Sequence, residues 1–173
     1  MTVFLSLGSN LGNREEHLRA AVRELIQRGV SVLRCASIYS TEPREVLDQP
    51  WFLNTVLSAD TDLSTDDLLS VCLEIEQVHR RTRHQMKGPR TLDIDILFFG
   101  NKIVQKPGLI IPHPALSTRR FVLAPLAEIA QDFVDPVSGK TVGQLLTDCN
   151  DTATVTRVSD ARVFCHPSPN APQ

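Results

Sequence analysis

Two aspartates, Asp93 and Asp95, stand in an otherwise aliphatic segment that runs from Thr91 to Phe99. Aspartate is disfavoured in β-strands, yet here the acids alternate with leucine and isoleucine. On a strand, both carboxylates would lie on one face and the aliphatic side chains on the other. A rise of about 3.3 Å per residue sets the two Cα atoms roughly 6.6 Å apart. Such a pair suits two Mg²⁺ ions that also bind phosphate oxygens. The alternative is an ordinary half-exposed strand with two solvated aspartates.

A basic tract directly precedes this segment, from His79 to Arg90. It contains five lysines or arginines and no acid, in a chain whose formal net charge is -2. Arginine binds phosphate through bidentate hydrogen bonds, so the tract and the two aspartates together predict a polyphosphate site. By itself, such a run of charge is usually a solvated helix end. Few aromatic residues accompany it, which argues against nucleic-acid binding through base stacking.

The composition bounds the kind of molecule that carries these residues. The chain has 173 residues, 42% of them hydrophobic, which suffices for one compact domain. We expect a single domain over residues 1–160 and a disordered, proline-rich tail over residues 161–173. The four cysteines form no C-x-x-C pair and are expected to be reduced. The sequence shows no basic leader and no apolar run long enough to span a bilayer, so a cytoplasmic location is expected.

Hydrophobic periodicity predicts the elements that position the candidate residues. Strands are expected at 3–7, 30–39, 52–59 and 91–99, and residues 102–104 are a possible hairpin partner for the last of these. Amphipathic helices are expected from Asn13 to Gly29 and from Ser64 into the basic tract, followed by helices at 118–130 and 142–146. This order predicts an α+β fold, a ferredoxin-like split βαβ sandwich whose mainly antiparallel sheet has helices on one face.

Several short motifs occur in an order that matches a known family. They are, in chain order, LSLGSNLG (5–12), STEP (40–43), QPWFLN (49–54), EIE (74–76), GPRTLDIDI (88–96) and IPHP (111–114), followed by Arg119 and Phe121. Through these motifs the chain resembles the 6-hydroxymethyl-7,8-dihydropterin pyrophosphokinases of folate biosynthesis. The resemblance covers roughly residues 2–158, and the GPRTLDID stretch is its most specific part.

The resemblance implies that pyrophosphate is transferred from MgATP to the hydroxymethyl group of the pterin, with release of AMP. It implies that Asp93 and Asp95 hold two Mg²⁺ ions. The residues with implied catalytic roles at the phosphates are Arg81, Arg90, His113 and Arg119. Those implied in nucleotide binding are Glu76, Arg83 and Ile96, together with His113 and Arg119. Those implied in pterin binding are Thr41, Pro43, Phe52, Asn54 and Phe121, where Asn54 would read the edge of the heterocycle and Phe121 would stack on its face.

Positioning and charge neutralisation are expected to supply most of the barrier reduction, without a side-chain nucleophile or an indispensable general base. The loops 44–49 and 83–88 are expected to be mobile and to close over ATP. The expected partners are the two small-molecule substrates, with no nucleic acid and no membrane, and the protein is expected to be a monomer. Two alternatives remain open: a ferredoxin-like module that binds RNA or protein, and a metal-dependent phosphohydrolase.

Overall fold

A computed structural model describes residues 1–43, 48–79 and 91–160 of the chain. Its main sheet is antiparallel throughout, with the strand order β5-β1-β4-β3-β8, and β2 also pairs with β4. These strands are β1 (Thr2–Ser9), β2 (Val30–Cys35), β3 (Ile38–Thr41), β4 (Phe52–Thr61), β5 (Asp93–Phe99) and β8 (Val155–Ser159). A separate two-stranded sheet consists of β6 (Val104–Lys106) and β7 (Leu109–Ile111). The antiparallel sheet and its order confirm the predicted fold class.

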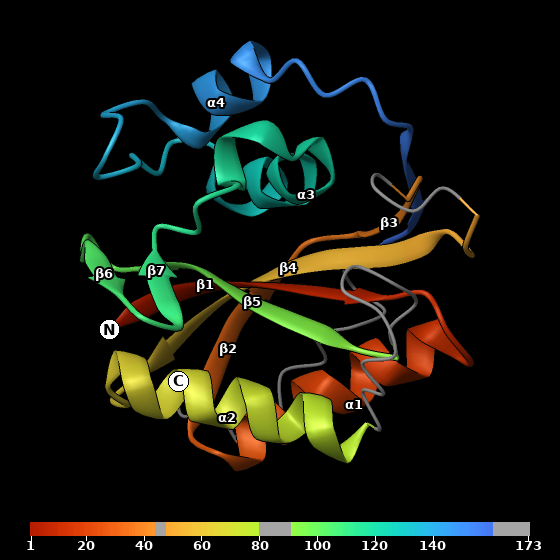
Figure 1. Cartoon of the computed structure of the whole chain (residues 1–173), viewed down its shortest axis with the longest axis horizontal. Coiled ribbons are helices and arrows are strands. Elements are labelled where there is room, and N and C mark those ends of the chain that lie inside the picture. The colour runs from red at the N-terminus through yellow and green to blue at the C-terminus, as the bar shows by residue number, and fades with distance from the viewer. Residues whose placement is uncertain (44–47, 80–90, 161–173) are drawn as a thin grey trace.

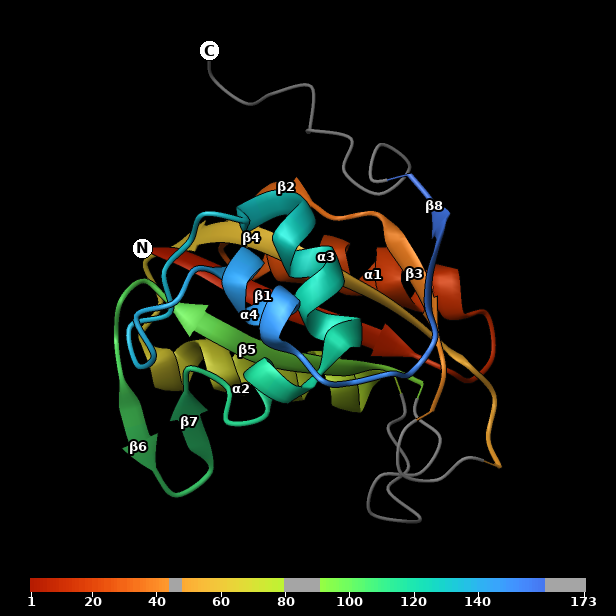
Figure 2. The same ribbon diagram turned by 90° about the horizontal axis from the view of Figure 1, so that it is seen from above.

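Helices cover both faces of the sheet (Figure 1). One face carries α1 (Arg14–Gln27) and α2 (Thr65–Val78), and the other carries α3 (Arg120–Ala130) and α4 (Val142–Asp148). Figure 2 shows α3 and α4 lying across the strands, with a short 3₁₀ helix (Leu116–Thr118) before α3. The expectation of helices on one face is therefore corrected. The physical reason is that the central strands carry apolar side chains on both faces, and each face must be covered.

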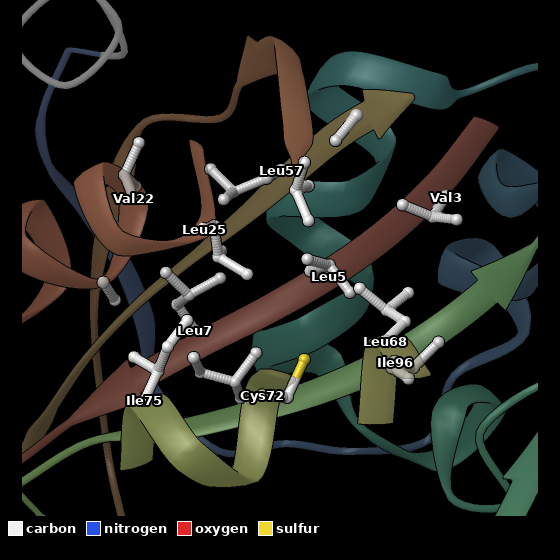
Figure 3. Packing of buried hydrophobic residues seen from close by; sticks show 14 of the residues in the cluster. Val3, Leu5, Leu7, Val22, Leu25, Leu57, Leu68, Cys72, Ile75 and Ile96 are labelled. Atoms are coloured by element: carbon white, nitrogen blue, oxygen red, sulfur yellow. The ribbon is translucent and has the colours of Figure 1, made fainter. Parts of the chain in front are cut away.

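Two hydrophobic cores follow from this alternation. Val3, Leu5 and Leu7 of β1 pack with α1 and α2, as Figure 3 shows. Phe4, between them in sequence, packs instead in the core beneath α3 and α4. The predicted cap of the first helix is confirmed, because Asn13 Oδ1 accepts a hydrogen bond from the Glu16 backbone N–H at 3.2 Å. Ser64 caps α2 in the same way. Each helix thus begins at a side chain that accepts one of the otherwise unpaired N–H groups of its first turn.

Three strand predictions need correction. The segment 30–39 is two strands, because the chain leaves the β2 ladder at Ala36 and Ser37. There the Ser37 N–H and hydroxyl donate to the Glu128 carboxylate of α3 and not to a neighbouring strand. The predicted hairpin of 91–99 with 102–104 is wrong, since β6 pairs with β7, and the backbone N–H of His113 donates to Leu97 of β5 instead. Strand β8 was not expected, because its side chains are mostly exposed and lack an alternating pattern.

The cysteine prediction is partly wrong. Cys72 and Cys149 are free thiols, but Cys35 takes part in a disulfide bond. Disulfide pairing depends on tertiary proximity, which spacing along the chain does not reveal. Among the described residues, no helix is long and apolar enough to cross a membrane. The predicted tail, 161–173, lies outside the described residues.

Candidate active site

The two aspartates lie as predicted on one face of β5. Asp93 and Asp95 are half-buried, whereas Leu92, Ile94 and Ile96 are buried. Ile94 and Ile96 belong to the core beneath α1 and α2, so the carboxylates project from the opposite face, on the side of α3. In the described part of the chain, no three acidic, histidine or cysteine side chains gather into a complete metal site. The two carboxylates therefore suit a hard cation that takes its remaining oxygen ligands from a phosphate or from water.

The strand register places Asp93 in one row with Asn54, one of the predicted pterin residues. Gly8 of β1 pairs with Asp93 on one side and with Asn54 of β4 on the other. Residues paired in this way project to the same face of an antiparallel sheet. Because Gly8 has no side chain, the Asn54 amide can lie against it, and a Cβ at position 8 would be only 2.6 Å from Asn54 Oδ1. The sheet thus brings the Asp93 carboxylate and the Asn54 amide onto one surface.

Glu76 stabilises the strand that carries the aspartates. It is 3% exposed on α2, and its Oε1 accepts a 2.8 Å hydrogen bond from the backbone N–H of Ile94, between the two acids. Burial, together with the charges of Glu76 and Asp95, raises the pKa of the neighbouring Cys72 thiol to about 12. Glu76 therefore fixes the backbone between the two aspartates.

His113 faces Asp95 from the segment that follows β7. Its Nε2 lies 4.0 Å from Asp95 Oδ1, and its Nδ1 accepts a hydrogen bond from the backbone N–H of Ala115 at 3.2 Å. Burial, helped by the nearby Arg119 charge, lowers the pKa of His113 to about 4. The imidazole is consequently neutral at pH 7, with its proton on Nε2, the nitrogen that faces the acidic site. It can donate a hydrogen bond there, but it is poorly suited to accept a proton.

A hollow of about 300 Å³ adjoins Asp95 and His113 at the outer edge of β5. Its walls are mainly apolar, from Leu69, Ile94, Ile96, Leu109 and Ile110. An apolar slot beside carboxylates and a histidine suits a flat ring attached to a polyphosphate. Ile96, predicted to contact the nucleotide, lines this hollow.

The predicted pterin residues of β3 and β4 are brought together. Asn54 and Thr41 are 4% and 2% exposed, and Asn54 Nδ2 donates to Thr41 Oγ1 at 2.6 Å. Phe52 is paired with Thr41 across the two strands, and Pro43 is buried at the end of β3. The hydrogen bond from Asn54 to Thr41 orients the Asn54 amide and leaves its Oδ1 directed toward β1. A Cβ at position 8 of β1 would lie 2.6 Å from this oxygen.

Arg119 and Phe121 flank the start of α3. The Arg119 guanidinium lies 5.7 Å from the centroid of the Phe121 ring, and Phe121 packs at the margin of the core beneath α3. The three remaining predicted residues, Arg81, Arg83 and Arg90, lie outside the described residues, as does most of the two loops expected to close over ATP.

Sequence reasoning missed two buried polar or small residues of this site. Gly8 leaves room for the Asn54 amide, since a Cβ at position 8 would lie 2.6 Å from Asn54 Oδ1. Asn10, 1% exposed, donates through Nδ2 to Gln49 Oε1 and to the Pro50 carbonyl, and so holds the chain that leads into β4. The available signal was the Gly8-Ser9-Asn10 sequence after an apolar strand, which by itself indicates only a tight loop.

Comparison with known proteins supports these assignments of fold and family. Residues 4–131 match the family model described as 7,8-dihydro-6-hydroxymethylpterin-pyrophosphokinase (HPPK). The chain is 42% identical over 150 residues to 2-amino-4-hydroxy-6-hydroxymethyldihydropteridine pyrophosphokinase of Synechocystis, covering 86% of this chain and 76% of that protein. It is 46% identical over 129 residues to the protein of the same name from Bacillus subtilis, covering 74% of this chain and 77% of that protein.

Longer proteins also match. The chain is 41% identical over 140 residues to the folic acid synthesis protein fol1 of Pneumocystis carinii, covering 81% of this chain but 19% of that protein. A crystal structure of wild-type Plasmodium falciparum HPPK-DHPS with pteroate superposes with a TM-score of 0.68 at 14% identity, over 85% of this chain and 42% of that chain. The alternative of an RNA-binding module and that of a phosphohydrolase receive no support from these matches. The chain belongs to the 7,8-dihydro-6-hydroxymethylpterin pyrophosphokinase family.

Proposed function

We propose that this protein transfers the terminal pyrophosphoryl group of ATP to 6-hydroxymethyl-7,8-dihydropterin, the reaction for which its relatives are named. The hydroxymethyl oxygen attacks the β-phosphorus, and the bond from that phosphorus to the oxygen bridging the α- and β-phosphates breaks. AMP leaves with the bridging oxygen, and the hydroxyl proton passes to solvent. The observation that carries this proposal is the row Asp93, Gly8 and Asn54 across three strands, which brings a carboxylate and an amide onto one surface.

Asp93 and Asp95 are the residues that would hold divalent cations, two Mg²⁺ ions in this proposal. Their fit rests on the donor set, since hard cations prefer carboxylate oxygens and the site is already rich in negative charge. Bound there, Mg²⁺ would neutralise charge on the polyphosphate during transfer. Glu76 keeps the two acids in position through the Ile94 backbone.

The other described residues bind and orient the substrates. His113, neutral and protonated on Nε2, donates a hydrogen bond at the phosphate end, and Arg119 contributes a fixed positive charge beside it. Asn54 offers an oriented amide to the donor and acceptor edge of the pterin, and Phe121 offers an aromatic face. In-line transfer needs little more than such positioning, so no side-chain nucleophile is required.

The direct test is AMP formation from ATP and Mg²⁺ with and without 6-hydroxymethyl-7,8-dihydropterin, with the diphosphorylated pterin identified by mass spectrometry. We expect AMP to appear only when the pterin is present. AMP release without the pterin would indicate hydrolysis, and failure to form either product would refute the proposal. The monomeric state remains a prediction that sedimentation velocity would test.

A further inference from the structure

The segment that links α4 to β8, and β8 itself, contacts both the start of α3, next to Phe121, and the end of β3, next to Thr41. We call residues 149–159 the strap. Figures 1 and 2 both show the chain leaving α4, passing the start of α3 and arriving beside β3. The strap contributes none of the residues assigned above to substrate or metal, so its contacts call for a separate explanation.

The first anchor of the strap is Asp151. Its Oδ2 accepts a hydrogen bond from the backbone N–H of Arg120 at 3.0 Å, and its Oδ1 accepts one from Ala153 at 3.1 Å. Arg120 lies between Arg119 and Phe121, at the first residue of α3. The residue before it, Arg119, makes no side-chain cap to the helix. Asp151 therefore accepts a hydrogen bond from a backbone N–H that the first turn of α3 would otherwise leave unpaired. It thereby holds the backbone next to Phe121.

The second anchor is a reciprocal pair between Glu42 and Thr154. The backbone N–H of Glu42 donates to the Thr154 carbonyl at 3.1 Å, and the backbone N–H of Thr154 donates to Glu42 Oε2 at 3.1 Å. Glu42 lies between Thr41 and Pro43, and the ladder continues with Thr41 paired to Val155. This pair holds the end of β3, where the Thr41 hydroxyl accepts the hydrogen bond that orients Asn54.

The two anchors are close together in the chain. Three residue steps separate Asp151 from Thr154, and an extended chain covers at most about 3.6 Å per residue, so the two points are at most about 11 Å apart. The strap thus ties the wall that carries Phe121 to the wall that carries Thr41 and Asn54. A flat heterocycle between an aromatic face and a polar edge requires a fixed separation of these walls.

We propose that Asp151 and Glu42 are positioning residues which, through the strap, set the width of the pterin pocket. This inference rests on the proposed function, because it assumes that Phe121 and Asn54 contact the pterin. Neither positioning residue is assigned a contact with a substrate. Their loss should weaken pterin binding selectively, since the β5 aspartates and His113 are held by other contacts.

The test compares variants at the two anchors with a matched acidic control. Asp151→Ala removes the first anchor, and Glu42→Ala removes the side-chain half of the second, because the Glu42 backbone N–H can still donate to Thr154. Glu42→Gln keeps a side-chain oxygen that can accept from Thr154. Asp148→Ala removes an exposed acid just before the strap, one that pairs with Lys140 at 2.8 Å. KM for pterin, KM for ATP and kcat would be measured with the AMP assay, and the melting temperature by calorimetry.

We expect Asp151→Ala and Glu42→Ala to raise KM for the pterin about tenfold while KM for ATP changes less than about twofold. Glu42→Gln and Asp148→Ala should stay within about twofold of wild type for both substrates. Unchanged pterin KM in folded alanine variants, or equal rises for both substrates, would overturn the inference while leaving the proposed function intact. If Asp151→Ala does not fold, the comparison of Glu42→Ala with Glu42→Gln decides the question. If the wild type makes no AMP with pterin, the proposed function fails and the inference fails with it.

Discussion

Gly8→Ala is the smallest change that should damage pterin recognition. Gly8 has an ordinary backbone conformation, so alanine introduces no backbone strain, but its Cβ would lie 2.6 Å from Asn54 Oδ1. Contacts that short do not persist, and one of the two groups must move. The β1 backbone is held by ladders to β4 and β5 on both sides. We therefore expect the Asn54 side chain to be displaced.

The cost follows from what holds Asn54. Its Nδ2 donates to Thr41 Oγ1 at 2.6 Å, and both side chains are buried. Displacement also takes the Asn54 amide away from the pterin edge, and a buried polar group of the bound pterin that is left unsatisfied costs about 1–3 kcal/mol of binding free energy. Since about 1.4 kcal/mol corresponds to a tenfold change in affinity, pterin binding should weaken by about 5- to 150-fold. Mg²⁺ and ATP binding should change little, because Asp93 and Asp95 keep their strand.

Equilibrium binding of 6-hydroxymethylpterin in the presence of a non-hydrolysable ATP analogue would measure this effect. Gly143→Ala is the matched control, because Gly143 lies on α4, away from the candidate site. A Cβ there would lie 3.0 Å from Cγ of Gln131, a flexible side chain that can move. A double-mutant cycle with Asn54→Ala isolates the mechanism, because Gly8→Ala should add almost nothing once the Asn54 amide is gone. Pterin affinity unchanged in Gly8→Ala, or fully additive losses in the double variant, would refute this reasoning.

Three further outcomes are expected. Glu76→Ala leaves the buried N–H of Ile94 without its acceptor and should lower the free energy of unfolding by about 1–3 kcal/mol in urea titrations. Glu76→Gln keeps an acceptor oxygen and should retain most of the wild-type free energy of unfolding. Burial, together with the charge of the nearby His79, lowers the pKa of His17 below 6.5, so the unfolded chain binds more protons on this group than the folded chain does. The folded state is therefore favoured above about pH 6.5 and loses that advantage as the pH falls. The melting temperature between pH 7.5 and 5 should fall less in His17→Gln than in the wild type, and an equal fall would contradict the assignment. Leu5→Ala, at a fully buried position of β1, should cost about 2–5 kcal/mol, and a smaller loss in the same urea titrations would show that the core relaxes around the cavity.

The elements that periodicity could reveal were predictable from the sequence. The alternation of Asp93 and Asp95 with aliphatic residues predicted both the strand and the shared face of the acids, since each side of a strand meets one environment. The helices over 14–27 and 65–78 were predictable because each has a buried stripe and a capping side chain within a few residues. These are local signals, and the structure confirms them.

The remaining features depend on residues far apart in the chain. The break between β2 and β3 is stabilised by Glu128, which follows Ser37 by 91 residues. Strand β8 exists because the edge of β3 is available for pairing, and its own sequence carries little pattern. The importance of Gly8 becomes visible only when the register sets it opposite Asn54. Periodicity within one segment does not contain that information.

We propose above that Asp93 and Asp95 hold the divalent cations that neutralise the ATP polyphosphate. Manganese binding, followed by electron paramagnetic resonance with a non-hydrolysable ATP analogue present, tests it most directly. Asp60→Asn is a suitable control, because Asp60 is an acid of β4 that accepts a hydrogen bond from Thr2 away from the site. We expect about two Mn²⁺ ions per chain in the wild type and in Asp60→Asn, and loss of tight binding in Asp93→Asn and Asp95→Asn. Wild-type stoichiometry and affinity in folded Asp93→Asn and Asp95→Asn variants would contradict the claim.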